Sequence, residues 1–461
     1  MAQFRPILSA ENLAGAPSRA VLPKVHLAAS VSIAHPRRNN FGHLLRYHPD
    51  RNIFIVFAIM NLRRHLLLML LGVIALAPTG SEGEEVPIPS RPIAAACAPT
   101  SDTPTGTTAS LLSVLTHAKN AYGLNAVIFN ATRGSKPILT TALGNSTPGV
   151  PASTAMHFRV GMAAEQFEAT LLLQLVDEKR INLADLVSKW FPAYPFANLA
   201  TVQMLASSSS GFGDYVTAKA DASRGIPSFT DLILKNPYQE FNTSELVRLS
   251  LFPYQQPQFV NPGGNWAYSH TEFVVLGSIL ETVTKKNYAT LLREMILNRL
   301  GLHNTVYPPT TEIQSPVLHA YTSDRDRYED STYWNPSWTS FSGQINSDVC
   351  DLAVWEQAFG TGKLLTPESA AKIAATTNVG LGRNTPALYF GLGTIVNNGW
   401  LVASGNFFGW HTATAYYPPT KTALVVTETE GPHTTKAEGV SNDILRQMSR
   451  VLTPTTPITL P

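Results

Sequence analysis

The stretch Met156–Trp190 has the sequence MHFRVGMAAEQFEATLLLQLVDEKRINLADLVSKW, and its middle, residues 166–176, is apolar on nearly every face. A helix of this kind belongs inside a large domain, where other elements cover it on all sides. Gly161 precedes the apolar run, so we expect the helix to begin there, with free N–H groups and the positive end of its dipole. Met162 and Glu165 are three residues apart and therefore share one face of the first turn.

The same stretch resembles the serine β-lactamase, penicillin-binding DD-peptidase and related esterase family. In that family the frame reads F-R-x-G-S-x-x-K, followed by a buried helix and a turn into L-x-D-x-V. The positions that keep this frame are Phe158, Arg159, Gly161, Leu183, Asp185 and Val187. The resemblance places the family's nucleophilic Ser at Met162 and its Lys at Glu165. The stretch therefore looks like an active-site helix without its reactive pair.

Other segments carry the resemblance in the family's order, over about residues 107–450. The family's T-x-x-x-L-L-x-H-T-S-G-L-x-D-Y segment is matched by Leu205, Ser210, Gly211, Asp214 and Tyr215. Its S-x-G-x-x-S-x-x-D-L-x-x-W run is matched by Gly343, Ser347, Asp351, Leu352 and Trp355, and its L-L-x-P-E-S by Leu364–Ser369.

Two segments match the parts of the family that carry further site residues. In residues 261–288, which resemble P-G-x-x-F-x-Y-S-N, the family's catalytic Tyr falls on Tyr268 and its Asn on His270. The family's K-T-G or H-x-G strand falls on Ala403-Ser404-Gly405, so its cation is replaced by Ala403. The resemblance implies that Tyr268 is the retained catalytic position and that His270, Ser404 and Gly405 line the binding site.

The three replacements all weaken the family's chemistry. In the family a Ser attacks a carbonyl, a Lys or Tyr takes its proton, and a Lys or His helps to bind the substrate carboxylate. The thioether of Met162 forms no acyl intermediate, and the carboxylate of Glu165 disfavours a phenolate at Tyr268, because like charges raise the pKa of an acid. Ala403 removes the remaining cation. The alternative is an ordinary helix start without a catalytic role. In that case Met162 packs in the core, and Glu165 interacts favourably with the positive end of the helix dipole.

A relocated nucleophile is not indicated by the sequence. The one Ser that stands three residues before a Lys is Ser369, with Lys372, in ESAAKIAA. It follows the Tyr268 segment, which reverses the family's order, and no Gly precedes it. We interpret it as part of a surface helix, and no G-x-S-x-G sequence is present either.

The expected fold is α/β (α+β) of the β-lactamase/transpeptidase type, with an antiparallel sheet of about five strands flanked by helices and a mainly helical lobe. We expect the sheet lobe at 107–160 and 385–450, the helical lobe at 161–384 and a loose tail at 451–461. Residues 124–129 and 137–143 are predicted as the first hairpin. Residues 412–417 and 421–427 alternate in polarity and are predicted as an edge hairpin around Pro418-Pro419.

Composition fits a large exported domain, since charged residues are only 14% and hydrophobic residues 44%. Residues 1–77 hold nine basic and two acidic residues, so the remainder has 34 − 9 = 25 basic and 32 − 2 = 30 acidic residues, a net charge of −5. No basic stripe for nucleic acid is expected in the body.

The N-terminal part is expected to be an export signal and a linker. Residues 60–77 have the positive start and short apolar run of a signal peptide, which makes 1–59 a non-native leader. The alternative is a single membrane anchor at 53–77. Arg63 and Arg64 lie in the middle of this span and argue against it, because charged side chains inside a membrane are costly. Residues 78–106 are rich in Pro and Thr and are typical of a linker. The predicted location is secreted or in the cell envelope, with membrane contact only through the signal.

The chain has two cysteines, Cys97 in the linker and Cys350 in the body. Two cysteines cannot form a dense disulfide framework, but they could form one disulfide bond in an oxidising compartment. The alternatives are that Cys97 is lipidated or is a free thiol. No His, Cys and Asp cluster has metal-ligand spacing, so neither a metal nor another cofactor is expected.

Three functional hypotheses follow from the residues and the resemblance. The first is an exported pseudoenzyme that keeps a cleft for a small-molecule, peptide, cell-wall or ester-like ligand. The alternative is an active esterase or DD-peptidase-like hydrolase that uses Glu165, Tyr268 and His270 in a non-standard mechanism. The third is a decayed gene product whose fold persists without a function.

Overall fold

The computed structural model describes residues 99–100, 103–251, 255–435 and 439–460, which belong to one compact unit. The predictions for residues 1–59 and 60–77, for most of the linker and for Cys97 lie outside the described residues. Within the described residues, no helix has both the length and the apolar character that crossing a membrane requires.

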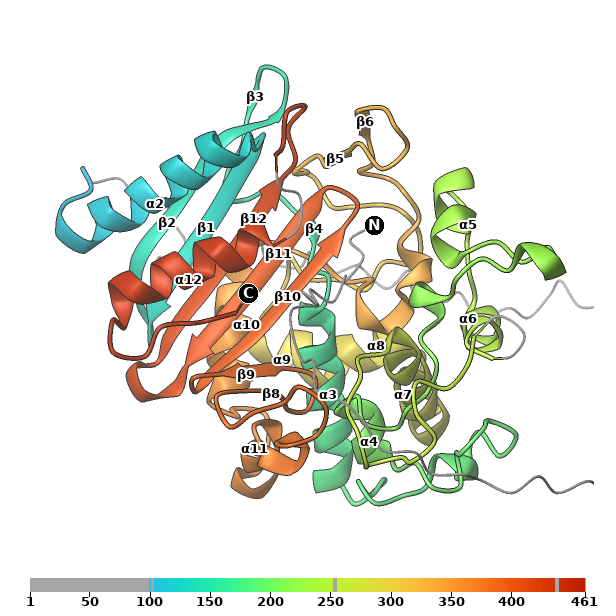
Figure 1. The fold of residues 1–461 in the computed structure, drawn as a ribbon. Helices are drawn as coiled ribbons and strands as arrows, with labels where there is room; N and C mark the ends of the chain where they lie inside the picture. The colour runs from blue at the N-terminus through green and yellow to red at the C-terminus, as the bar shows by residue number, and fades with distance from the viewer. Residues whose placement is uncertain (1–98, 101–102, 252–254, 436–438, 461) are drawn as a thin grey trace, which may run out of the picture. The chain divides into compact units, whose positions relative to one another are not determined.

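An antiparallel sheet forms the centre of this unit (Figure 1). Its five long strands confirm the expected sheet, and three short strands extend it at the two edges. In sheet order the strands are β3 (Val150–Pro151), β2 (Lys136–Thr147), β1 (Ala126–Arg133), β12 (Thr422–Thr429), β11 (Trp410–Tyr417), β10 (Trp400–Phe407), β9 (Ile395–Asn397) and β8 (Leu388–Phe390).

Helices cover both faces of the sheet, as Figure 1 shows. On one face lie α2 (Gly106–Tyr122) and α12 (Val440–Leu452); on the other lie α3 (Ala163–Asp177) and α10 (Val349–Gly360). Side chains alternate between the two cores along a strand, as the period of two requires. On β10, Val402 joins the core under α2 and α12, whereas its neighbours Leu401 and Ala403 join the larger core on the opposite face.

The segment between β3 and β8 holds the remaining helices and two small ladders, one pairing β4 with β7 and one pairing β5 with β6. The α-helices are α4 (Val202–Ala206), α5 (Phe229–Lys235), α6 (Thr243–Leu249), α7 (His270–Thr284), α8 (Tyr288–Leu292), α9 (Asn298–Leu300) and α11 (Pro367–Ile373). The short strands are β4 (Phe158–Arg159), β5 (Tyr321–Thr322), β6 (Glu329–Asp330) and β7 (Asn346–Ser347).

Two expectations about the C-terminal part were wrong. The hairpin of β11 and β12 is not at an edge, because β11 lies between β10 and β12, and β12 pairs with β1. Every residue of β12, TALVVTET, is buried, so its Thr and Glu side chains do not mark a solvent face. The end of the chain is not loose either: Ile458 and Leu460 are buried, and Trp400 Nε1 donates to the carbonyl of Thr456 at 2.8 Å.

The α3 helix is buried along its length, as the apolar run predicts. Every residue from Ala163 to Leu175 is buried, including Glu165, Gln166 and Glu168. Gly161 has a positive φ of 57°, a conformation that glycine adopts without a steric cost, and this turns the chain sharply into the helix.

Several buried carboxyl groups make stability depend on pH in an unusual direction. Glu356 on α10 is fully buried, and no ion pair reaches it within the described part of the chain. Burial raises the pKa of its carboxyl from 4.5 to about 8. Because the pKa of Glu356 is raised in the folded state, its contribution to the free energy of unfolding is fully present below pH 4.5. This contribution is lost as the pH rises toward 8.

We therefore expect the melting temperature of the protein to fall between pH 5 and pH 8. Glu356→Gln, which cannot ionise, should make this fall smaller and leave the melting temperature at pH 5 nearly unchanged. Differential scanning calorimetry of both proteins across that range is the measurement. An equal fall in both would mean that Glu356 does not titrate in this window.

Candidate active site

The start of α3 lies directly against strand β10. A Cβ atom added to Gly405 would come within 2.4 Å of the Met162 backbone nitrogen, and one added to Gly161 would come within 3.3 Å of three backbone atoms of Gly405. The neighbouring backbone thus excludes a side chain at Gly405, and at Gly161 a side chain would be tightly packed and would strain the positive φ of 57°. The turn at Gly161-Met162 and the strand at Ser404-Gly405 therefore form one wall of the site.

Tyr268 reaches the same place from the segment before α7. Its Oη donates a hydrogen bond to Oε1 of Glu165, which lies one turn into α3. The His270 ring packs edge-on to the Tyr268 ring with centroids 4.9 Å apart. Met162, Tyr268 and His270 are partly exposed, whereas Glu165 is fully buried. The structure thus brings together Met162, Glu165, Tyr268, His270 and the Ser404-Gly405 strand.

Burial controls the protonation of the Glu165–Tyr268 pair. Burial raises the pKa of Glu165 well above 4.5, the hydrogen bond from Tyr268 lowers it in part, and Glu272 and Asp214 raise it further. The pKa of Tyr268 is also raised well above 10, first by burial and then by Glu165. A phenolate at Tyr268 is therefore strongly disfavoured, and the phenol acts as a hydrogen-bond donor to the carboxyl group.

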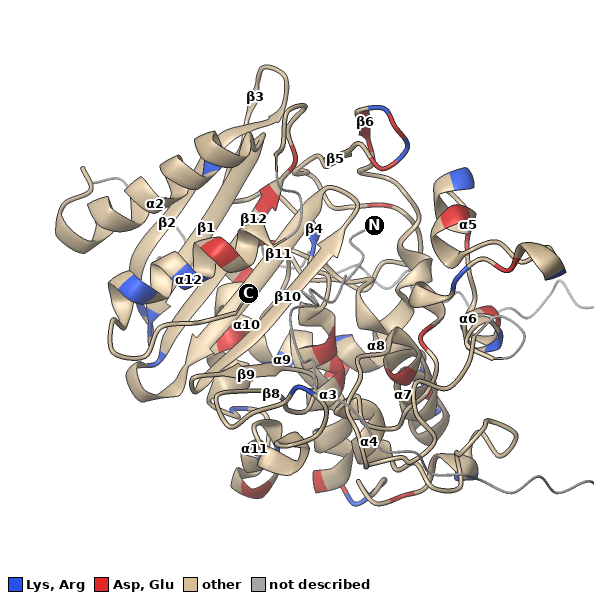
Figure 2. Ribbon diagram, in the orientation of Figure 1, with Lys and Arg blue, Asp and Glu red and all other residues tan. Residues whose placement is uncertain are grey.

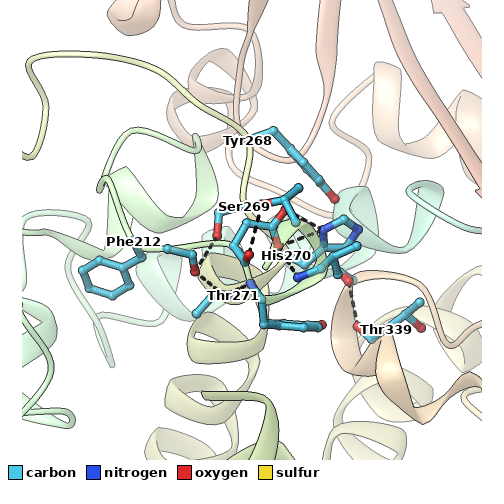
Figure 3. A network of polar contacts seen from close by, with 12 residues as sticks. Phe212, Tyr268, Ser269, His270, Thr271 and Thr339 are labelled. Carbon is cyan, nitrogen blue, oxygen red and sulfur yellow. Dashed lines mark hydrogen bonds and ion pairs between the residues drawn. The ribbon is translucent and has the colours of Figure 1, made fainter. Parts of the chain in front are cut away.

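Two acidic residues near this pair were not named as site residues from the sequence. Asp214 accepts from Val216 N at 3.1 Å, and its carboxylate oxygens lie 3.3 Å from Nδ1 of His270. Glu272 is fully buried in the first turn of α7 and accepts hydrogen bonds from the backbone N–H and the hydroxyl of Ser210. Figure 3 shows the network of polar contacts around the segment Tyr268–Thr271.

The sequence gives only a weak indication that these acidic residues belong to the site. Glu272 stands at the beginning of an apolar helix, where an acidic residue is ordinarily a surface residue near the dipole. Only the packing of α7 against α3 and α4 shows that it is buried. Figure 2 shows acidic positions on both α3 and α7 near one another.

The position of the family's cation is occupied by a small, buried side chain. Ala403 on β10 is 1% exposed and belongs to the same core as α3. Ser404 and Gly405 are partly exposed beside it. The strand therefore presents no cation to the site at this position.

Arg159 is a buried structural residue next to the site. Its guanidinium donates to Asn346 Oδ1 at 3.1 Å and to the Thr311 carbonyl at 3.0 Å, and it lies 5.1 Å from the centre of the Phe407 ring. Burial lowers the pKa of Arg159 to about 9. The arginine thus fixes β4 beside the end of β10 rather than facing a ligand.

Ser369 and Lys372 do not form a second active pair. Ser369 is buried, and its hydroxyl donates to Asp177 at 2.6 Å, while Lys372 pairs with Glu368 at 2.8 Å. The Ser369 contact joins α11 to the end of α3, whereas the Lys372 ion pair lies within α11. Among the described residues, no group of three or more His, Cys, Asp or Glu side chains is arranged to hold a metal ion.

Comparisons with curated proteins reveal distant relatives. The chain is 25% identical over 296 residues to a penicillin-binding protein from Bacillus subtilis (strain 168), covering 60% of this chain and 61% of that protein. It is 25% identical over 311 residues to a putative D-alanyl-D-alanine carboxypeptidase from Salmonella agona, covering 60% and 65%. The chain thus spans less than two thirds of the length of these relatives.

Solved structures and a family model agree with these relatives. A D-stereospecific amidohydrolase from Streptomyces sp. superimposes with a TM-score of 0.64 and 25% identity, covering 75% of this chain and 99% of that one. A penicillin-binding protein from Bacillus halodurans superimposes with a TM-score of 0.59 and 20% identity, covering 72% and 98%, which supports the fold alone. The beta-lactamase family model matches residues 113–443, which is most of the chain. The chain therefore belongs to the beta-lactamase family.

Proposed function

We propose that this protein is a member of the family that does not form an acyl-enzyme and instead binds a ligand at the former catalytic centre. The observation that carries the proposal is Met162 at the start of α3, beside Gly405, where the family's motif has its Ser. A thioether has no proton to lose and forms no acyl ester. Removing the nucleophile of a serine hydrolase typically lowers turnover by about 10⁶-fold.

The group beside Met162 supports the same proposal. Glu165 stands where the family has a Lys, and it is engaged by the Tyr268 hydroxyl. Because burial keeps the pKa of Glu165 high, the carboxyl group favours its protonated form and does not withdraw a proton from an attacking group. With Ala403 in place of the cation, the site also lacks the family's usual partner for a substrate carboxylate.

The ligand we propose is a small peptide-like, cell-wall or ester-like molecule. Relatives are described as a putative D-alanyl-D-alanine carboxypeptidase and a D-stereospecific amidohydrolase, and these names suggest short substrates with a carbonyl group. The partly exposed groups available to such a ligand are Met162, Tyr268, His270 and the Ser404-Gly405 strand. We propose His270, Ser404 and Gly405 as binding positions.

A second candidate function is hydrolysis by water without a covalent intermediate. The observation that favours it is the convergence of two proton-carrying pairs, Tyr268 with Glu165 and His270 with Asp214. In this alternative His270 or Glu165 takes a proton from water, and Tyr268 donates to the developing oxyanion. It competes with the binding proposal and is tested separately below.

We also propose that the protein is exported. Cys350 is disulfide-bonded, and the only other cysteine of the sequence is Cys97, which lies outside the described residues. Disulfides persist in oxidising compartments, and the signal-like sequence of residues 60–77 agrees with that location.

The absence of acylation is the first test. The purified parent protein should not be labelled by a fluorescent penicillin on a denaturing gel, whereas Met162→Ser combined with Glu165→Lys and Ala403→His should regain labelling. The matched control carries Met162→Ala with the same two other changes and should stay unlabelled. Covalent labelling of the parent would refute the proposal.

The second test separates binding from water-based hydrolysis. We expect the parent to hydrolyse a short-chain nitrophenyl ester no faster than Glu165→Gln. Glu168→Gln is the matched control, because Glu168 is also buried on α3 and its pKa is likewise raised. If the parent and Glu168→Gln were both about 100-fold faster than Glu165→Gln, general acid–base catalysis at Glu165 would be established and the pseudoenzyme proposal would fall.

The export proposal has a direct chemical readout. A peptide map of the secreted protein under non-reducing conditions should join the peptide containing Cys97 to the one containing Cys350, and reduction should separate them. Recovery of the protein only inside the cytoplasm, with both cysteines as free thiols, would contradict it.

A further inference from the structure

A buried cluster of titratable groups lies at one end of the sheet, away from the site described above. His411 on β11 stands directly opposite Glu428 on β12 and is 3% exposed. Its Nε2 lies 2.9 Å from Oε1 of Glu430, just past the end of β12. Glu428 is fully buried, and neither of its carboxyl oxygens has a hydrogen-bond partner within the described residues.

This cluster lies beneath the hairpin formed by β5 and β6. The Tyr328 hydroxyl at the hairpin donates to the Glu430 carbonyl at 3.0 Å and accepts from the Asn125 side chain at 2.6 Å. The Tyr328 ring also stacks on Tyr321 of β5, with centroids 5.2 Å apart and an interplanar angle of 16°. The hairpin is therefore hydrogen-bonded to Glu430, the residue whose side chain pairs with His411.

The hairpin also touches the turn between β10 and β11. A Cβ on Gly409 would come within 2.1 Å of the Tyr321 carbonyl oxygen, and Ser331 donates from its hydroxyl to the Phe408 carbonyl at 2.5 Å. Any displacement of the hairpin must therefore alter the packing of this turn. Figure 1 shows β5 and β6 beside the upper ends of β11 and β12.

The same turn is connected to the candidate active site through aromatic rings. Phe407 and Phe408 both pack on Trp338 with centroids 5.6 Å away, and Trp338 lies 6.3 Å from the His270 ring. Phe407 is also two residues along β10 from Gly405, which contacts Met162. A change at the hairpin thus has a continuous packed route to the site.

We infer that His411, Glu428 and Glu430 form a pH-sensitive latch, which holds the β5–β6 hairpin and the β10–β11 turn in acid and loosens them as the pH rises above neutral. This inference is independent of whether the site binds a ligand or hydrolyses one. It depends only on the contacts of the cluster with the hairpin.

The charge balance of the cluster gives the direction of the switch. Burial raises the pKa of the Glu428 carboxyl to about 7, His411 opposes this rise and Glu430 adds to it. Burial lowers the pKa of His411, but Glu428, Glu430 and Asp324 of the hairpin outweigh this, so it lies above 6.5. The hairpin also carries Arg325 and Arg327, which pair with Glu329, and Asp330, which pairs with His319. Asn125 before β1 and Asn406 opposite His411 on β10 are uncharged.

In acid, a protonated His411 is balanced by Glu430 while Glu428 is neutral. As the pH rises through about 7, Glu428 gains a buried negative charge, and further deprotonation of His411 removes the balancing positive charge. Both steps raise the net negative charge of the buried cluster, which also faces the Asp324 side chain of the hairpin. An opened hairpin admits water to these groups, so a higher pH favours opening.

The test is hydrogen–deuterium exchange of the full chain at pH 5.5 and pH 8, corrected for the intrinsic pH dependence of exchange. Protection of peptides covering 321–331 and 405–411 should fall about tenfold or more at pH 8, given the raised pKa of Glu428. Peptides of β1, residues 126–133, serve as the internal reference and should change much less.

Two variants make the result specific. Glu428→Gln, which mimics the protonated carboxyl, should keep the hairpin protected at pH 8. Glu356→Gln removes another buried carboxyl, on α10, and should leave the loss of protection as in the parent. Hairpin protection that is the same at both pH values in the parent, or a Glu428→Gln variant with the parent's pH dependence, would overturn the inference.

Discussion

The close approach of the Gly161-Met162 turn to Gly405 is the constraint on which the site depends. It brings the first turn of a buried helix against the backbone of a strand, with no side chain between them. Such contact is possible only because Gly161 adopts a positive φ and because both glycines lack a Cβ. Once the helix start is fixed there, Glu165 one turn on must face the segment that brings Tyr268.

The family frame and the family chemistry are separable in this chain. Arg159, Gly161 and Gly405 set the geometry through packing and hydrogen bonds, and all three are retained. Met162, Glu165 and Ala403 would carry the reactivity, and each replacement is compatible with burial: Met and Ala are apolar, and Glu165 is neutralised by its surroundings. Loss of reactivity therefore does not require loss of the fold.

The sequence was sufficient for the parts of the fold that depend on local pattern and motif order. The long apolar run predicts the buried α3, and the motif order predicts the five long strands. The central position of β11 and β12 was missed because the Thr and Glu residues of β12 suggest an exposed face, although α10 and α12 cover both sides. Strand order depends on long-range pairing, which alternation along one strand does not encode.

The sequence also predicted only part of the candidate site, because the rest depends on long-range packing. Motif positions place Met162, Glu165 and Tyr268 in one site and Asp214 in a matched segment, but the contact of Asp214 with His270 and the burial of Glu272 follow only from the assembled fold. Whether a carboxyl is buried also decides its charge, and burial is a property of the assembled fold.

The buried carboxyls of this chain suggest a common physical setting for its two acidic regions. Glu165 at the site and Glu428 at the sheet end are both fully buried, and no ion pair with Lys or Arg reaches either within the residues that the structure describes. A group of this kind is least costly when it carries a proton, so acid favours the packed form in both places. Because the β10–β11 turn adjoins the hairpin above Glu428 and the strand beside Met162, raising the pH loosens the sheet end and the wall of the site in the same direction.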